Sequence, residues 1–441
     1  MRSKLDYGCI VYGSARNSFL KALDPIHHQG LRIALGAFRT SPKESLYAEA
    51  GEPPLKLRRL RLAMNYCLKL KSNPSNPAFP CVFGPQLSAE YVKKPNETPP
   101  LGIRIQESFQ TANIDVNSVS DIPLKTELPS WKITSPLVNL NLACLRKRET
   151  PDAVFKQKYL EETIQYKHYN KIFTDGSLKG DNVAAAAVSN KHFDCPFQLR
   201  LPDFCSIYTA ELRAIMLAMK HIYQSTENNF LILSDSLSAL QAMQTRKISH
   251  PLLADVHNLH SELRSEGKNI VFMWVPGHVG IRGNTIVDQA AKDALHMTIP
   301  NLPKQSIPYS DLKRQTSVFC RKLWQEEWSS QTNNKLFQIC PDLSDPLPLS
   351  LQNRKEQTVL CRLHIGHTYI THSFLLRGEE IPWCHACDSS LSVRHILTEC
   401  TDITAERKRF LNTRNLTSIF RNVSLSCIFQ FLKCIGLYHK I

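Results

Sequence analysis

Short apolar runs alternate with longer amphipathic stripes between about residues 168 and 298, and this order limits the possible folds more than any other feature. Phe230–Leu233 is a continuous apolar run, as expected for a strand that is buried on both faces. Helical spacing of apolar residues follows several such runs. Strands that alternate with helices predict an α/β domain, with a mixed sheet covered by helices. The expected strands are 171–174, 182–189, 230–233 and 269–274, and the expected helices begin at Glu211, Ser236 and Asn284.

The rest of the chain divides by composition into three regions around residues 166–298. Residues 1–72 carry helix-like apolar spacing and are expected to be helical. Residues 73–165 are rich in Pro, Ser and Asn, which predicts a linker with short ordered pieces, such as one around Trp131. Residues 305–441 are expected to be mostly helical, with prolines between 341 and 348 interrupting the helices.

The charge of the chain favours a polyanionic partner, because 54 Lys and Arg against 39 Asp and Glu leave a net charge of +15. We therefore expect a nucleic acid as partner and no small-molecule substrate. No secretory signal and no apolar run long enough to cross a membrane is visible. The 14 cysteines are scattered, which suits a reducing compartment. We therefore expect an intracellular protein, in the nucleus or the cytoplasm, that is not secreted.

Four acidic residues occur in order through the α/β segment: Asp175, Glu211, Asp235 and Asp288. Asp175 and Asp235 are expected at strand ends, and Glu211 and Asp288 in the first turns of helices, so that all four meet at one edge of the sheet. A Pro-Gly-His loop that carries His278 precedes the last acid. Carboxylates held close together repel one another unless cations neutralise them. The pattern predicts a site for two Mg²⁺ ions that act on a phosphodiester.

The segment from about 171 to 296 resembles the ribonuclease H domain. It shares Asp-Gly-Ser at Asp175, Ala-Glu-Leu at Glu211, Asp-Ser at Asp235, the Pro-Gly-His loop and the closing Asp288. The resemblance implies a ribonuclease H-like fold with mostly helical flanking regions, and cleavage of the RNA strand of an RNA–DNA hybrid. It implies that the four acids bind Mg²⁺, for which Mn²⁺ can substitute, and that His278 assists proton transfer or product release.

A second group of possible metal ligands lies near the C-terminus, in the pattern Cys384-x2-Cys387-x7-His395-x4-Cys400. A Cys-x-x-Cys turn presents two thiolates to one ion, and a following helix can supply His and Cys. This pattern predicts a structural Zn²⁺ site, with His385 and His372 as alternative ligands. The competing interpretation is a group of buried thiols beside a histidine that is satisfied by hydrogen bonds.

The flanking regions extend the resemblance to arthropod-type non-LTR retrotransposon polyproteins, of the jockey and I-element kind. The chain then resembles a C-terminal fragment of such a polyprotein, with residues 1–72 as a remnant of the reverse transcriptase. It contains no Tyr-x-Asp-Asp sequence, so we expect no polymerase activity. The motifs that carry this resemblance are Tyr7–Ser14, Leu31–Gly36, Ala50–Leu55, Arg362–Thr368, Thr371–Ser373, Cys384-x-x-Cys387 and His395–Cys400.

Three functions remain open from the sequence. The first is an active Mg²⁺-dependent ribonuclease H. The second is a non-catalytic remnant that binds nucleic acid and keeps the acids. The third is a DNA-cutting nuclease of the integrase kind, which usually carries only three acids.

Overall fold

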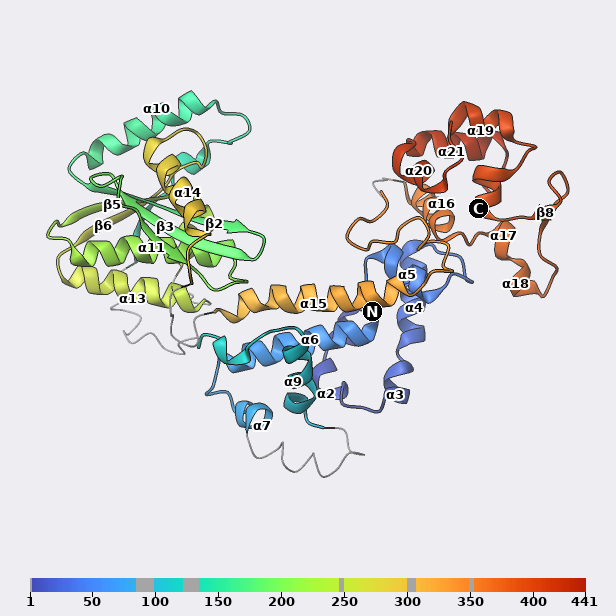
Figure 1. The fold of residues 1–441 in the computed structure, drawn as a ribbon, viewed down its shortest axis with the longest axis horizontal. Helices are drawn as coiled ribbons and strands as arrows, with labels where there is room; N and C mark the ends of the chain where they lie inside the picture. Colours follow the sequence, from blue (N-terminus) through green and yellow to red (C-terminus); the bar gives the residue numbers. More distant parts are fainter. Residues whose placement is uncertain (1, 85–98, 122–134, 246–249, 300–306, 349–352) are drawn as a thin grey trace. The chain divides into compact units, whose positions relative to one another are not determined.

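The computed structural model describes residues 2–84, 99–121, 135–245, 250–299, 307–348 and 353–441 (Figure 1). These residues form two compact units. The terminal unit contains the described residues of Met1–Ala63, Tyr91–Leu101 and Ser317–Ile441. The sheet unit contains those of Met64–Glu90 and Gly102–Thr316.

A six-stranded mixed sheet organises the sheet unit, in the order β1-β6-β5-β2-β3-β4. β1, β6, β5 and β2 run parallel to one another, and β3 and β4 continue the sheet in antiparallel pairing. Residues 183–188 of β3 are fully buried, which explains why this part of the strand is apolar. The strands are β1 (Leu137–Asn139), β2 (Asn170–Lys179), β3 (Asn182–Ser189), β4 (Phe197–Arg200), β5 (Asn229–Ser234) and β6 (Asn269–Trp274).

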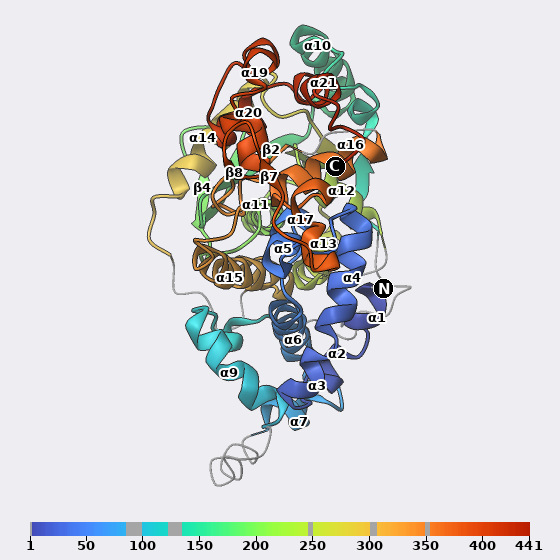
Figure 2. The same cartoon turned by 90° about the vertical axis from the view of Figure 1, so that its right-hand side faces the viewer.

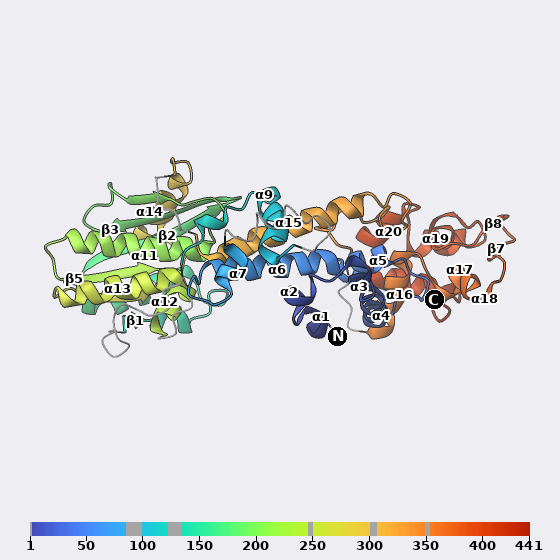
Figure 3. The same ribbon diagram turned by 90° about the horizontal axis from the view of Figure 1, so that it is seen from below.

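Helices cover both faces of this sheet (Figures 1 and 3). The alternation of side chains along β2 places Ile172 in the core beneath α11, α12 and α13, and Phe173 in the core beneath α10 and α14. Both faces of the sheet are therefore buried, as is usual for parallel strands. The covering helices are α10 (Asp152–Thr163), α11 (Ile207–Gln224), α12 (Leu237–Gln244), α13 (Pro251–Ser265) and α14 (Arg282–Ala294).

The predicted fold class, a mixed sheet flanked by helices with helical terminal regions, is confirmed. Two strands, β1 and β4, were not predicted from the sequence. β1 has three residues and β4 has four, which are too few to show the two-residue alternation of a strand. β1 and α10 lie in the stretch 73–165, expected as a linker, so the sheet unit includes part of that stretch. The ordered piece expected around Trp131 lies outside the described residues. The other short elements there are α7 (Phe79–Phe83), α9 (Leu101–Thr111), η1 (Val116–Ser118), η2 (Asn141–Cys144) and η3 (Ile164–Tyr166).

The terminal unit joins the two ends of the chain in one hydrophobic core. Leu46 near the start and Phe420 near the end are both buried in it. Arg362 Nε donates to the carbonyl oxygen of Gly36 at 2.9 Å, which ties the same two segments together. The expected N-terminal and C-terminal helical regions thus share one core. α4 and α5 pack against each other in it (Figure 2).

The elements of the N-terminal part are α1 (Arg2–Asp6), α2 (Cys9–Tyr12), α3 (Asn17–Lys21), α4 (Asp24–Leu35), α5 (Lys43–Ala50) and α6 (Leu55–Lys71), of which α6 ends in the sheet unit. The C-terminal part begins within α15 (Tyr309–Ser329) and continues with α16 (Arg354–Ile365), α17 (Tyr369–His372), α18 (Phe374–Arg377), β7 (Trp383–Cys384), β8 (Ser389–Ser390), η4 (His395–Glu399), α19 (Thr404–Phe410), α20 (Leu416–Asn422) and α21 (Leu425–Cys434). In the described ranges, none of the helices combines the length and the apolar character that crossing a bilayer requires.

Candidate metal and catalytic site

Three of the four predicted acids meet at one edge of the sheet. The carboxylates of Asp175, Glu211 and Asp235 each offer an oxygen, and these atoms lie within 4.8 Å of one another. Asp175 is on β2, Glu211 is on α11, and Asp235 directly follows β5. Three separate elements therefore deliver one carboxylate each to the same point.

The parallel pairing of β2 with β5 sets the positions of two of these acids. The paired residues end at Thr174 and Ser234, and the next residue on each strand is an acid. The hydroxyl of Thr174 donates to the carbonyl oxygen of Leu233 at 3.2 Å, which fixes this register. Asp175 was expected at a strand end, but β2 continues to Lys179 because β3 pairs with it beyond that point.

A close approach of α11 to β2 brings Glu211 to the other two acids. A Cβ atom at Gly176 would lie 2.8 Å from the Cβ of Ala210 and 2.9 Å from the backbone nitrogen of Glu211. Only glycine allows this distance, which accounts for the glycine after Asp175. Glu211 lies in the second turn of its helix, not the first as expected, because the helix begins at Ile207.

The start of α11 is held by a residue that the sequence analysis did not identify. Asp311 is only 4% exposed, and its Oδ2 accepts from the backbone nitrogen of Ser206 at 3.0 Å and from the hydroxyl of Thr209 at 2.6 Å. Ser206 also caps the helix with its own hydroxyl. Asp311 therefore fixes the turn of α11 that precedes Glu211, although about a hundred residues separate the two partners in sequence.

Burial and mutual repulsion raise the pKa of all three carboxyl groups. Burial, followed by the charges of Asp235 and Asp288, raises the pKa of Asp175 to about 8. Burial and then the neighbouring Asp175 and Asp235 raise the pKa of Glu211 well above its usual value. Burial also raises the pKa of Asp235, against hydrogen bonding from Asn284 and the charge of His278. Such a group is costly when all three are ionised.

The donor set suits a hard divalent cation. All three groups offer oxygen, which Mg²⁺ and Mn²⁺ prefer. In addition, Oε2 of Glu211 is buried and has no hydrogen-bond partner in the described part of the chain. A buried carboxylate oxygen without a partner is rare in folded proteins, and a cation would satisfy it.

Asp288, the fourth predicted acid, lies close to this group but outside it. Its Oδ2 accepts from Lys292 Nζ at 2.6 Å, one helical turn away, and lies 4.0 Å from Nδ1 of His278. Its charge acts on Asp175. The expected first-turn position is wrong, because α14 begins at Arg282, and the predicted cap Asn284 is a buried residue within the helix.

His278 lies on the loop between β6 and α14. Its φ is +61°, a left-handed conformation that non-glycine residues rarely adopt. Its side chain is 70% exposed. The preceding Gly277 lies against the site, because a Cβ there would lie 2.4 Å from Oδ2 of Asp235. The loop thus presents an exposed imidazole beside the carboxylates.

Residues 167–296 match the protein-family model described as RNase H. This segment is a ribonuclease H domain. The match confirms the predicted domain and supports a hydrolase role at the level of the family. It implies that the class of nucleic acid bound is an RNA–DNA hybrid.

The C-terminal Cys/His cluster lies outside the ribonuclease H domain. Ligand atoms of Cys384, Cys387, His395 and Cys400 all lie within 4.8 Å of one another. The Sγ of Cys400 is 3.9 Å from that of Cys384 and 3.8 Å from that of Cys387. The described residues place neither His385 nor His372, the alternative ligands, in this group.

Local hydrogen bonds surround the sulfur and nitrogen atoms of this cluster. The backbone nitrogen of Thr401 donates to the Sγ of Cys387 at 3.2 Å. Hydrogen bonds from the hydroxyl and the backbone of Thr401 lower the pKa of Cys387 to about 7, which favours the thiolate that binds metals. The Nε2 atom of His395 is buried and unpartnered within the described residues, whereas its Nδ1 lies 3.4 Å from the hydroxyl of Ser389.

Proposed function

We propose that the chain is a Mg²⁺-dependent endoribonuclease that cleaves the RNA strand of an RNA–DNA hybrid. One observation carries the proposal: three carboxylates from three elements lie within 4.8 Å of one another at the edge of the sheet. Burial and mutual repulsion raise the pKa values of these groups, and bound cations would neutralise them. The RNase H match of the same segment supports this class of substrate.

Asp175, Glu211 and Asp235 would hold the cations, with Asp288 as a further ligand from α14. A pair of divalent ions, when bound, supplies stabilisation of the charge on the attacking and leaving oxygens of the scissile phosphate. Mn²⁺ can take the place of Mg²⁺, because it accepts the same oxygen ligands.

His278 and Lys292 act beside these ligands. The exposed imidazole of His278 is free to reach the substrate and to transfer a proton near the leaving oxygen. Lys292 holds the carboxylate of Asp288 through a hydrogen bond of 2.6 Å. The positive charge of Lys292 also lowers the pKa of Asp175, against the larger effects of burial and of the neighbouring acids.

A panel of end-labelled substrates tests this function. We expect cleavage of the RNA strand in an RNA–DNA hybrid, dependent on Mg²⁺ or Mn²⁺ and abolished by EDTA. Duplex DNA and single-stranded RNA should stay intact. Binding of the hybrid without cleavage would instead favour a non-catalytic nucleic-acid-binding protein, and cutting of duplex DNA would favour an integrase-like nuclease.

We also propose that Cys384, Cys387, His395 and Cys400 hold one structural Zn²⁺. Four protein ligands leave no open position for catalysis. The Nε2 atom of His395, which has no hydrogen-bond partner among the described residues, supports this assignment. Metal analysis of the purified chain should find zinc, and Cys387→Ser should lose it and unfold at a lower temperature. Zinc-free protein that a chelator does not destabilise would contradict the assignment.

The motifs outside the ribonuclease H domain support an origin in a retroelement polyprotein. In this proposal residues 1–72 derive from the region after the reverse transcriptase palm, 73–165 connect it to the nuclease at 166–298, and 305–441 form the C-terminal region. Since the chain has no Tyr-x-Asp-Asp sequence, primer extension on an RNA template should yield no product. Robust extension would contradict the proposal.

A further inference from the structure

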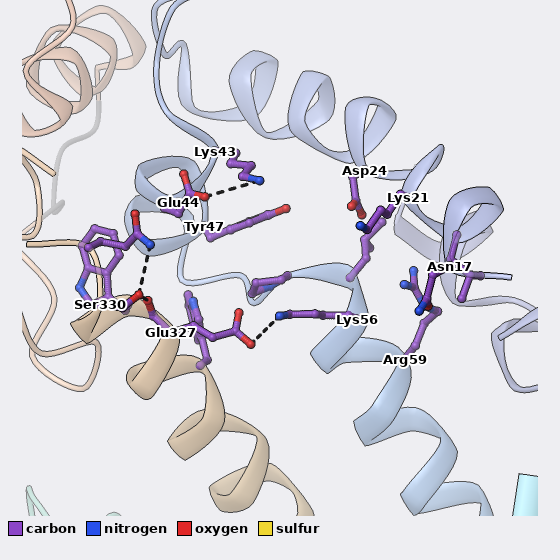
Figure 4. A pocket seen from close by; sticks show the side chains of 16 residues that line it. Asn17, Lys21, Asp24, Lys43, Glu44, Tyr47, Lys56, Arg59, Glu327 and Ser330 are labelled. Atoms are coloured by element: carbon purple, nitrogen blue, oxygen red, sulfur yellow. Dashed lines mark hydrogen bonds and ion pairs between the residues drawn. The ribbon is translucent and has the colours of Figure 1, made fainter. Parts of the chain in front are cut away.

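Two hollows in the terminal unit differ in their charge. The larger, about 460 Å³, is bordered by four cations and three acids around Tyr47 (Figure 4). Two of these cations are paired: Lys56 Nζ lies 2.7 Å from Glu327 and Lys43 Nζ lies 3.6 Å from Glu44. The positive charge of this hollow is thus largely compensated, and its chemistry does not select an anion.

The smaller hollow, of about 280 Å³, has a different lining. It lies on α19 and the turn that follows, next in sequence to the Cys/His cluster. Three of its six lining residues are cations and none is an acid. The six are Thr404, Arg407, Lys408, Asn412, Thr413 and Arg414. A concave surface with this lining favours an oxyanion.

Arg407 forms the rigid floor of this hollow. The residue is 3% exposed, and its guanidinium donates from Nε to the carbonyl oxygen of Leu397 at 3.0 Å and from Nη2 to that of Cys400 at 2.7 Å. Both of these acceptors are neutral carbonyls. Cys400, Cys387 and Glu399 also interact electrostatically with Arg407, so its positive charge is partly compensated. A guanidinium that is held in a fixed position is suited to bind a phosphate.

The rim of the hollow offers exposed donors. Lys408 and Arg414 are exposed, and in the described part of the chain neither forms an ion pair or hydrogen bond. Thr413 accepts from the backbone nitrogen of Asn415 at 3.2 Å, so its own hydroxyl hydrogen remains available. Asn412 has a φ of +49°, and its backbone nitrogen donates to the carbonyl oxygen of Arg407 at 3.1 Å. This tight turn brings Arg414 back to the helix.

We infer that this hollow binds a backbone phosphate of nucleic acid. Arg407 supplies the fixed charge, and Lys408 and Arg414 close on the phosphate from the rim. Contacts of this kind read the backbone and carry no base preference. The site would therefore add affinity to the whole chain without adding sequence specificity. It complements the proposed nuclease but does not depend on cleavage.

The test measures binding of a fluorescent RNA–DNA hybrid by the full chain that carries Asp235→Asn, so that the nuclease site is inactive. The buffer contains no Mg²⁺ or Mn²⁺ and no chelator, so that a bound Zn²⁺ is retained. In this background Lys408→Ala/Arg414→Ala is compared with Arg39→Ala/Lys440→Ala. The control removes the same two kinds of exposed charge from elsewhere in the terminal unit. Both variants leave the buried residues in place, and equal thermal unfolding would verify that they fold.

We expect Lys408→Ala/Arg414→Ala to bind the hybrid at least about threefold more weakly than the control, for every base sequence tested. The slope of log affinity against log salt should fall by about 1 to 2, as expected when up to two phosphate contacts are lost. Equal affinity and equal salt slope in the two variants would overturn the inference. So would an effect confined to free inorganic phosphate, seen by calorimetry, with hybrid binding unchanged. If the wild-type chain does not cleave the hybrid, this result would contradict the proposed nuclease function but not the phosphate site.

Discussion

Gly277 shows how closely the loop before α14 approaches the carboxylates. In Gly277→Ala the new Cβ would lie 2.4 Å from Oδ2 of Asp235, so the loop or the acid must move. A displacement of about 1 Å at a catalytic group lowers rates by about a hundredfold. We expect hybrid cleavage to fall at least about tenfold, measured by single-turnover kinetics, while hybrid binding changes little.

Gly180→Ala is the matched control for this substitution. Gly180 lies in the turn between β2 and β3, where a Cβ meets open space, but its φ is +62°. The control should cost about 1 kcal/mol of folding free energy and leave cleavage by the folded protein intact. Equal losses of cleavage in both variants would show that the loop position does not matter.

Asp175 illustrates the cost of placing three carboxyl groups close together. Without divalent cations at neutral pH, Asp175→Asn should unfold at a higher temperature than the wild type, because asparagine replaces a carboxyl group that must take up a proton on folding. Mg²⁺ should raise the unfolding temperature of the wild type much more than that of the variant, since ligands stabilise the state that binds them. Each kcal/mol corresponds to about 2–4 °C in calorimetry. An equal shift with Mg²⁺ in both proteins would argue against this site.

At the scale of elements, Asp311 links α15 to the start of α11. Two charge-assisted hydrogen bonds depend on it, so Asp311→Ala should cost about 2–4 kcal/mol of folding free energy, measured by denaturant unfolding. Since α11 carries Glu211, cleavage should also fall at temperatures where the variant is folded. The exposed Asp194 provides a control, and Asp194→Ala should change neither property. Full activity of folded Asp311→Ala would show that Glu211 does not need this support.

Some strands and site residues could be predicted from the sequence, and others could not. β3, β5 and β6 were predicted because each is a long apolar run between turns, and the acids were located by the short motifs that surround them. Asp311 could not be found in this way, because no local pattern connects it with Ser206. β1 could not be found either, because three residues in a Pro-rich stretch form a strand only through pairing with β6.

A stacked histidine pair in the terminal unit predicts a pH dependence of stability. The rings of His367 and His372 lie 3.7 Å apart. Burial, His372 and Lys335 lower the pKa of His367 to about 3, and burial and Lys335 lower the pKa of His372 to about 4. Both values lie below the ordinary 6.5, so the unfolded chain takes up protons first as the pH falls.

Stability should therefore be retained above about pH 6.5 and lost as the pH falls from there towards 4. His367→Gln/His372→Gln should weaken this dependence, measured as the unfolding temperature between pH 7 and pH 5. The exposed His168 serves as a control, and His168→Gln should keep the wild-type profile. A double variant with an unchanged profile would show that other groups cause the acid sensitivity.

At the scale of the whole molecule, the composition indicates the class of partner, and the two structural units indicate where that partner could bind. The net charge of +15 indicated a polyanionic partner but did not locate it. The structure suggests two places, the carboxylate edge of the sheet unit and the basic hollow of the terminal unit. That both ends of the chain share one core could not be predicted, because contacts such as Arg362 to Gly36 span most of the sequence.

The most direct test of the central claim is cleavage of a labelled RNA–DNA hybrid in Mg²⁺ by the wild type and by Asp235→Asn. Asp181→Asn, which changes an exposed acid in the turn after β2, is the matched control. We expect the wild type and the control to cut the RNA strand. We expect Asp235→Asn to bind the hybrid but to cleave it at least about a hundredfold more slowly. Binding by all three proteins with cleavage by none would contradict the central claim.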